Sequence, residues 1–229
     1  MKLSWQQIPS TIISDILSQN SLDGVVIDTE HGGFNTETLC ACIQVVTLNK
    51  KKCFVRLTEA NKTIVRVCLD MGCDGIIFST VESEKESELI RDMCIYPSRG
   101  GKRGLGLVRD NLWGLKRLNR DSSPILIAQI ESSAGVDNIE GIFSKSIFNF
   151  YMIGPYDLSA SVGDPGNFEN EKYKSAISKV RDIVPDNMMA VHIPTNVENE
   201  KKKYENYGII ALGMDTTSII EKYREIENA

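Results

Sequence analysis

The sequence of 229 residues predicts an α/β protein, a (β/α)8 TIM barrel built as one domain over residues 1–229. Short apolar runs, typical of buried parallel strands, alternate with longer amphipathic runs, and the alternation repeats eight times. No linker, composition shift or low-complexity segment interrupts this pattern. An open doubly wound sheet is the alternative fold, but no Gly-x-Gly-x-x-Gly motif follows an early strand.

The expected strands are apolar runs of strand-forming residues that lead into polar side chains. The second run ends in Asp28, the third ends at Arg56, and the sixth runs directly into Gly154. The fifth run is almost purely apolar. In order, the strands are expected over residues 2–5, 25–28, 53–57, 75–79, 124–130, 148–153, 188–193 and 209–213.

The expected helices are runs in which apolar residues recur three and four positions apart, which gives each helix one apolar face. Ile12, Ile13 and Ile16 have this spacing in the first helix, and Gly72 is a typical stop for the third. In order, the helices are expected over residues 9–18, 36–48, 62–71, 83–94, a short segment after Ser133, 170–184, 196–207 and 216–227.

A long segment, residues 96–119, has neither pattern and is rich in Gly and Arg. Loops of this length are uncommon in compact domains unless they have a function, and they often cover active sites. We therefore treat residues 96–119 as a candidate functional loop.

The charge and cysteine content exclude several classes of protein. The formal net charge is −5, and no cluster of Lys or Arg is interleaved with aromatic residues, which argues against nucleic acid as a partner. The six cysteines include no Cys-x-x-Cys pair, which predicts reduced, buried thiols rather than a zinc site. Neither a signal-like segment nor a run long enough to span a bilayer is present. We expect a cytoplasmic protein with no membrane partner.

The carboxyl ends of the expected strands carry polar side chains, and in a barrel these ends meet at one mouth. The residues at these ends are Asp28, Glu30, His31, Arg56, Gln129, Glu131, Gly154, Asp157, His192 and Asp215. Glu131 and Asp157 follow consecutive strands, so we expect their carboxylates to meet over one point, as a hard divalent cation such as Mg²⁺ or Mn²⁺ requires. The alternative is that each carboxylate caps the helix that follows it.

Six segments together resemble the HpcH/HpaI aldolase family, in the family's order and with close to its spacing over nearly the whole chain. They are Ile27-Asp28-Thr29-Glu30-His31-Gly32, Val55-Arg56, Leu69-Asp70-Met71-Gly72-Cys73, Gln129-Ile130-Glu131-Ser132, Gly154-Pro155-Tyr156-Asp157-Leu158-Ser159 and Leu212-Gly213-Met214-Asp215-Thr216-Thr217. Any one alone would be a weak signal, but together they are strongly specific. The resemblance implies a class II, divalent-metal-dependent aldolase, an aldehyde-lyase. Such enzymes cleave a 4-hydroxy-2-oxo acid to pyruvate, or a close relative, plus an aldehyde, or catalyse the reverse addition.

By similarity to the family, Glu131 and Asp157 hold the metal ion, and the 2-oxo acid chelates it. Mg²⁺ or Mn²⁺ is expected, with Co²⁺ as a third candidate, acting as a Lewis acid toward the pyruvate enolate. Arg56 is expected over the keto oxygen, where it adds a fixed positive charge as negative charge develops. Gln129 is expected to position a metal-bound water or the substrate.

The resemblance also implies an acid/base and a shared active site. His31 is the candidate acid/base, since only an imidazole titrates near neutrality without a large shift of its pKa. In the family a carboxylate of a neighbouring subunit orients this histidine, and the matching residue is Asp70. A homo-oligomer is therefore expected, built from dimers and with a hexamer as one candidate state. Backbone amides near Gly154 and Pro155, and the helix start after Ser133, are expected to help hold the substrate carboxylate.

The chain departs from the family pattern in four places. It starts almost at the first strand, so we expect the family's leading helix, which covers the barrel floor, to be missing. Phe78-Ser79-Thr80 stands in place of Val/Ile-Pro-Met, and the loop motif that starts at Tyr96 is changed and one residue longer. The seventh strand ends in His192, for which we expect a hydrogen-bonded structural role. These changes lie where the acceptor aldehyde would bind, so they leave the electrophile open.

Two alternatives to the aldolase remain at this point. One is a citrate-like acid synthase or lyase that uses the same metal-enolate chemistry. The other is a catalytically silent barrel that acts as an assembly subunit.

Overall fold

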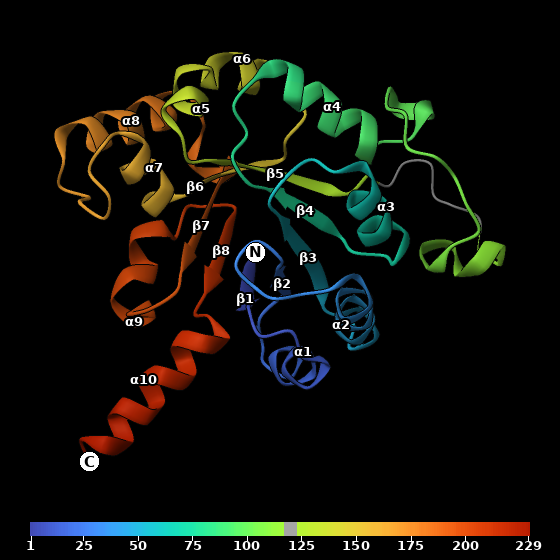
Figure 1. Cartoon of the computed structure of the whole chain (residues 1–229), viewed down its shortest axis with the longest axis horizontal. Coiled ribbons are helices and arrows are strands. Elements are labelled where there is room, and N and C mark those ends of the chain that lie inside the picture. Colours follow the sequence, from blue (N-terminus) through green and yellow to red (C-terminus); the bar gives the residue numbers. More distant parts are fainter. Residues whose placement is uncertain (117–122) are drawn as a thin grey trace.

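Eight parallel strands form a closed barrel with helices around its outside in the structure, a computed structural model that describes residues 1–116 and 123–229 (Figure 1). Each strand pairs with the next along the chain, and β1 pairs with β8 to close the barrel. The strands are β1 Lys2–Gln6, β2 Gly24–Asp28, β3 Lys52–Leu57, β4 Gly75–Phe78, β5 Ile125–Ile130, β6 Phe150–Ile153, β7 Met189–Ile193 and β8 Ile209–Leu212. The predicted TIM barrel is confirmed.

The α-helices connect these strands, and most begin with a side-chain cap. Ser10, Asn35, Asn61, Ser83 and Asn170 each accept a hydrogen bond from a backbone N–H of the first turn, which satisfies a donor that has no partner within the helix. The α-helices are α1 Thr11–Ser18, α2 Thr36–Leu48, α3 Lys62–Asp70, α4 Glu84–Cys94, α5 Ser133–Asp137, α6 Ile139–Ser144, α7 Pro155–Ser161, α8 Glu171–Ile183, α9 Val197–Glu200 and α10 Asp215–Glu227.

Three segments differ from the elements that the sequence predicts. The expected helix over residues 196–207 is the short α9 followed by a 3₁₀ turn, Lys201–Tyr204. The helices α6 and α7 were not predicted, because each is too short to show a helical period. The long loop contains two 3₁₀ segments, Pro97–Arg99 and Arg109–Gly114. Residues 117–119 of the predicted loop lie outside the described residues.

The side chains inside the barrel lie in layers, each contributed by alternate strands. The two apolar layers contain Leu3, Phe54, Ile127 and Ala190, then Val26, Ile77, Met152 and Ala211. Toward the carboxyl ends of the strands, the strand register adds a layer of Trp5, Arg56, Gln129 and His192, then a last layer of Asp28, Ser79, Gly154 and Gly213. The interior therefore changes from apolar to polar at the mouth, and three of the four residues in the last layer are small.

A second apolar core lies between the outside of the barrel and its helices, and five of the six cysteines belong to it. All six are free thiols; Cys40 is half-buried and the other five are buried. Burial raises the pKa of Cys68 and of Cys94 to about 12 and the pKa of Cys53 well above its ordinary value, so these thiols stay protonated. Among the described residues, no helix is long and apolar enough to cross a bilayer.

Candidate active site

An ion pair between the ends of β2 and β3 fixes the position of Arg56. Its Nε donates to Asp28 Oδ1 at 2.8 Å and its Nη2 donates to Asp28 Oδ2 at 2.6 Å, while Nη1 lies 2.7 Å from Glu30 Oε2. Asp28 is fully buried. Burial would raise the pKa of this carboxyl, but the hydrogen bonds and charge of Arg56, with a hydrogen bond from Trp5, hold it below its ordinary value. Hydrogen bonds to Asp28 therefore engage two of the five N–H groups of Arg56, and the Nη1 group, in ion-pair contact with Glu30, is open to a ligand oxygen.

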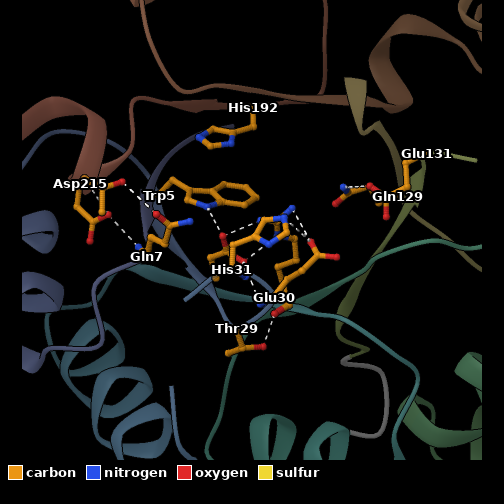
Figure 2. Close-up of polar contacts among 12 residues, drawn as sticks. Trp5, Gln7, Thr29, Glu30, His31, Gln129, Glu131, His192 and Asp215 are labelled. Atoms are coloured by element: carbon orange, nitrogen blue, oxygen red, sulfur yellow. Dashed lines mark hydrogen bonds and ion pairs between the residues drawn. The ribbon is translucent and has the colours of Figure 1, made fainter. Parts of the chain in front are cut away.

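Trp5 on β1 supports this ion pair and carries a stacked histidine. Its Nε1 donates to Asp28 Oδ2 at 3.2 Å, and the Arg56 guanidinium carbon lies 5.0 Å from its ring centroid. The His192 imidazole stacks on Trp5 with centroids 4.0 Å apart (Figure 2). Its Nε2 lies 3.1 Å from the carbonyl oxygen of Gly213, so this nitrogen carries the proton and donates. Burial lowers the pKa of His192 to about 4. The structural role expected for His192 agrees with these contacts.

The turn after β2 presents Glu30 and His31 at the mouth (Figure 2). Asp28 Oδ1 accepts from the backbone N–H groups of Glu30 at 3.1 Å and His31 at 3.4 Å, which fixes the turn. The His31 side chain is 58% exposed, and its Nε2 lies 3.9 Å from Glu30 Oε2. His31 is therefore open to a ligand or to a second chain, in contrast to the buried Arg56.

Glu131 after β5 is a buried carboxylate with a donor on each oxygen. Thr80 Oγ1 donates to Oε1 at 2.7 Å, and Gln129 Nε2 donates to Oε2. The pKa of Glu131 is raised, first by burial and then by the negative charges of Glu30 and Asp157. Thr80 has φ of 53°, which is unusual for a β-branched residue and places its hydroxyl against the carboxylate. Because a Cβ at Gly154 would collide with Glu131, glycine is required there.

Asp70 is at the opposite end of the barrel from His31 within one chain. It is the last residue of α3, which leads into the amino-terminal end of β4, whereas His31 follows the carboxyl end of β2. There Asp70 Oδ1 accepts from Arg103 Nη2 at 3.1 Å. Arg103 is buried and lies 4.6 Å from the ring centroid of Tyr96. A contact between Asp70 and His31 therefore requires two chains.

The expected carboxylate-binding amides have partners of their own. The Gly154 N–H donates to the Ile130 carbonyl at 3.2 Å, and the Ser133 N–H donates to Ser161 Oγ at 2.8 Å. Pro155 is the first residue of α7, so the next N–H groups, at Tyr156 and Asp157, are the first ones on this helix that can reach a ligand. Asp157 itself is exposed in the first turn of α7, where its charge suits the helix dipole.

The sequence profile of the HpcH/HpaI aldolase/citrate lyase family matches residues 5–222, which is nearly the whole chain. The chain belongs to this family. A 4-hydroxy-2-oxovalerate aldolase from Rhodococcus jostii (strain RHA1) is 28% identical over 218 residues, which cover 93% of this chain and 84% of that protein. The chain is therefore a member of a family of lyases, as the six sequence motifs predict.

Two solved structures share the fold of this chain. An HpcH/HpaI aldolase/citrate lyase family protein from Burkholderia cenocepacia J2315 superposes with a TM-score of 0.90 at 20% identity, covering 100% of this chain and 93% of that chain. The citrate synthase SbnG superposes with a TM-score of 0.82 at 25% identity, covering 99% of this chain and 90% of that chain. The barrel is thus the one that HpcH/HpaI relatives use.

The mouth has the donors that a divalent cation of this family would need. Within residues 1–116 and 123–229, no three His, Cys, Asp or Glu side chains are grouped to hold a metal. Mg²⁺ prefers one or two protein carboxylates and completes its shell with water and substrate, so the pair Glu131 and Asp157 fits it. A cation would offset the negative charges that raise the pKa of Glu131, and the absence of a Cβ at Gly154 lets the Glu131 carboxylate occupy this position.

Sequence reasoning missed three groups at this site. The sequence predicts Trp5 only as part of the first strand, although Trp5 lies two positions after Leu3, which places both side chains on one face. Thr80 and Ser79 are departures from the family pattern, and the sequence assigns them no role. The turn conformation of Thr80 was the missing information, since neither sequence spacing nor propensity predicts a positive φ for threonine.

Proposed function

We propose that this chain is a divalent-metal-dependent aldolase that forms or cleaves a carbon–carbon bond next to a 2-oxo acid. The observation that carries the proposal is that the fixed Arg56 cation and the buried Glu131 carboxylate lie at the same mouth. The negative charges of Glu30 and Asp157 add to the effect of burial and raise the pKa of Glu131. Glu131 and Asp157 would hold the cation, which supplies a Lewis acid when bound. The 28% identity to a 4-hydroxy-2-oxo acid aldolase supports the same substrate class.

Arg56 stabilises the charge that develops on the substrate. Its N–H groups that are not bonded to Asp28 donate to the keto oxygen, which becomes an enolate oxygen during cleavage. The bidentate bond to Asp28 and the contact with Trp5 hold the guanidinium in place before the substrate arrives, so no reorganisation is needed at the moment of reaction. Gln129, fixed by its bond to Glu131, orients a substrate oxygen or a water molecule.

His31 moves the proton between the substrate hydroxyl and the solvent side of the mouth. Its exposure leaves it accessible to Asp70 of a neighbouring subunit, which would orient the imidazole. We therefore propose a homo-oligomer in which each active site combines His31 of one chain with Asp70 of another. Within one chain, Arg103 holds the Asp70 side chain in a defined position.

Release of pyruvate from oxaloacetate by the purified protein tests this proposal. Decarboxylation leaves the same enolate as aldol cleavage, whatever the natural aldehyde. Activity should disappear after chelation and return with Mg²⁺, Mn²⁺ or Co²⁺, well above the rate with metal alone. A folded protein that no metal activates would contradict the proposal and favour the silent assembly subunit.

A citrate-like reaction is the second candidate, because a citrate synthase is among the similar structures at 25% identity. It would use an enolate of an activated acetyl group and oxaloacetate as the electrophile. Citrate detected from oxaloacetate and an acetyl thioester, with no aldol product from pyruvate and aldehydes, would favour this reaction.

A further inference from the structure

Three buried polar atoms at the mouth have no hydrogen-bond partner among the described residues. One, Glu30 Oε2, lies in an ion pair with Arg56, and the other two are Ser79 Oγ and Gln129 Oε1. Ser79 is 4% exposed and Gln129 is 3% exposed, so both are cut off from bulk water by the surrounding protein. A buried polar group without a partner is costly, and such groups are retained where a ligand or a water completes them.

Gln129 belongs to β5, and Ser79 directly follows the neighbouring strand β4. Ile77 and Ile127 line the inner core, and the side chains of Ser79 and Gln129 follow two positions later on the same faces. The pairing of Phe78 with Ala128 places Ser79 beside Gln129. The strand β4 lies between β5, which carries Gln129, and β3, which carries Arg56. The pair therefore borders the space in which Arg56 and Glu131 would act on a substrate.

The chemistry of the pair selects one kind of ligand group. Because a carboxylate only accepts, Glu131 fixes the Gln129 amide with Nε2 toward it, which leaves Oε1 as a pure acceptor. A carboxylate has no proton for that acceptor, and an ammonium group would lie close to the Arg56 guanidinium. A neutral hydroxyl can donate to Gln129 Oε1 and also pair with Ser79 Oγ, which both donates and accepts.

We propose that Ser79 and Gln129 form a subsite for a hydroxyl group next to the carbonyl of a substrate. The enzyme would thereby prefer a hydroxylated 2-oxo acid or a hydroxylated aldehyde over its unsubstituted counterpart. This inference rests on the proposed aldolase function and adds the substrate class that the same site takes.

Two pairs of substrates locate the hydroxyl. In the donor pair, hydroxypyruvate is compared with pyruvate, each with acetaldehyde. In the acceptor pair, glycolaldehyde is compared with acetaldehyde, each with pyruvate. The wild type should prefer the hydroxylated member of one pair, and Ser79→Ala should lower that kcat/KM ratio by about ten-fold, the value of one neutral hydrogen bond. The other ratio, and oxaloacetate decarboxylation, should not change.

Ser18→Ala is the matched control, because Ser18 is also 4% exposed but lies on α1, where its hydroxyl donates to Ser14 O at 2.6 Å. Ser18→Ala should lower the Tm and leave both ratios unchanged, whereas Ser79→Ala should not lower the Tm, since its hydroxyl bonds to no described residue. Unchanged ratios in Ser79→Ala that still decarboxylates oxaloacetate would overturn the subsite alone. A wild type without decarboxylation would overturn the proposed function and the subsite with it.

Discussion

At the scale of single residues, Arg56 has a structural role and a chemical role, and an alanine substitution would remove both at once. Removing its charge would leave the fully buried Asp28 unpaired, which destabilises the fold. Arg56→Lys keeps the charge but loses the bidentate bond, so kcat for oxaloacetate should fall by about two orders of magnitude with the fold retained. Circular dichroism checks the fold. Arg91→Lys, at a partly exposed ion pair with Asp92, should leave kcat unchanged; equal rates in both variants would contradict the role of Arg56.

Glu131 is expected to bind the metal directly. Glu131→Gln keeps the shape of the side chain and its contact with Thr80 but removes the negative charge. The Kd for Mn²⁺ should therefore rise by more than about ten-fold, because loss of a residue that only supports a metal ligand already weakens metal binding by at least that factor. Calorimetry or electron paramagnetic resonance measures this Kd without any turnover. Glu140→Gln, at an exposed position of α6, is the control. Unchanged Mn²⁺ binding in Glu131→Gln would place the metal elsewhere.

His192 makes the stability of the protein depend on pH. The pKa of His192 in the folded protein is about 4, below the ordinary value of 6.5. As the pH falls, His192 therefore binds a proton in the unfolded chain at a higher pH than in the folded protein. The free energy of unfolding should therefore drop by about 2 kcal/mol between pH 6.5 and about pH 5. Denaturant titrations at both pH values measure this drop. His192→Phe should remove most of it, and His31→Gln, at the other histidine, should retain it; the same drop in both variants would contradict the assignment.

The residues of the mouth were predictable to different degrees. Arg56, Gln129 and Glu131 each end a strand, and the barrel brings strand ends together, so their convergence follows from the sequence pattern. The Asp28–Arg56 pair was not predicted, although both residues were recognised as strand ends, because side-chain pairing depends on strand register. The roles of the predicted site residues remain predictions that the variants above test.

At the scale of elements, Asp215 connects the two ends of the chain. It stands at the start of α10, is 6% exposed, and accepts from the backbone N–H groups of Gln7 at 2.9 Å and Ile8 at 2.8 Å after β1. Asp215→Ala should lower the free energy of unfolding by about 3 kcal/mol, since it leaves two N–H groups without a charged acceptor. Urea unfolding measures this loss. Asp137→Ala, with a 77% exposed side chain, should cost far less, and equal losses would refute the connection.

Strands were predicted more accurately than the short helices. Buried apolar runs mark the strands regardless of their surroundings, and each predicted strand overlaps an observed one. The helices α6, α7 and α9 have between four and seven residues, too few for a periodic pattern. Their conformation depends on how the chain must run between a strand end and the next helix, which only the closed barrel specifies.

At the scale of the whole molecule, the shared active site predicts complementation between inactive variants. His31→Ala and Asp70→Ala should each lose most of the activity as pure proteins. Unfolded, mixed and reassembled together, they should regain activity, because some sites then combine an intact His31 with an intact Asp70. The oxaloacetate assay measures the recovery. A mixture no more active than either variant would show that the two residues do not act in one site.

The sequence by itself determined the barrel, the family and the residues that reach the mouth, because strand periodicity and strand-end motifs are local properties of the chain. Only the tertiary structure decided how those residues pair. The register of β2 and β3 joins Asp28 to Arg56, closure of β1 against β8 stacks Trp5 on His192, and the conformation of Thr80 fixes Glu131. It also left Ser79 Oγ and Gln129 Oε1 at the mouth without a hydrogen-bond partner among the described residues. These contacts join residues far apart in the chain, and their geometry depends on barrel closure, which no local pattern encodes.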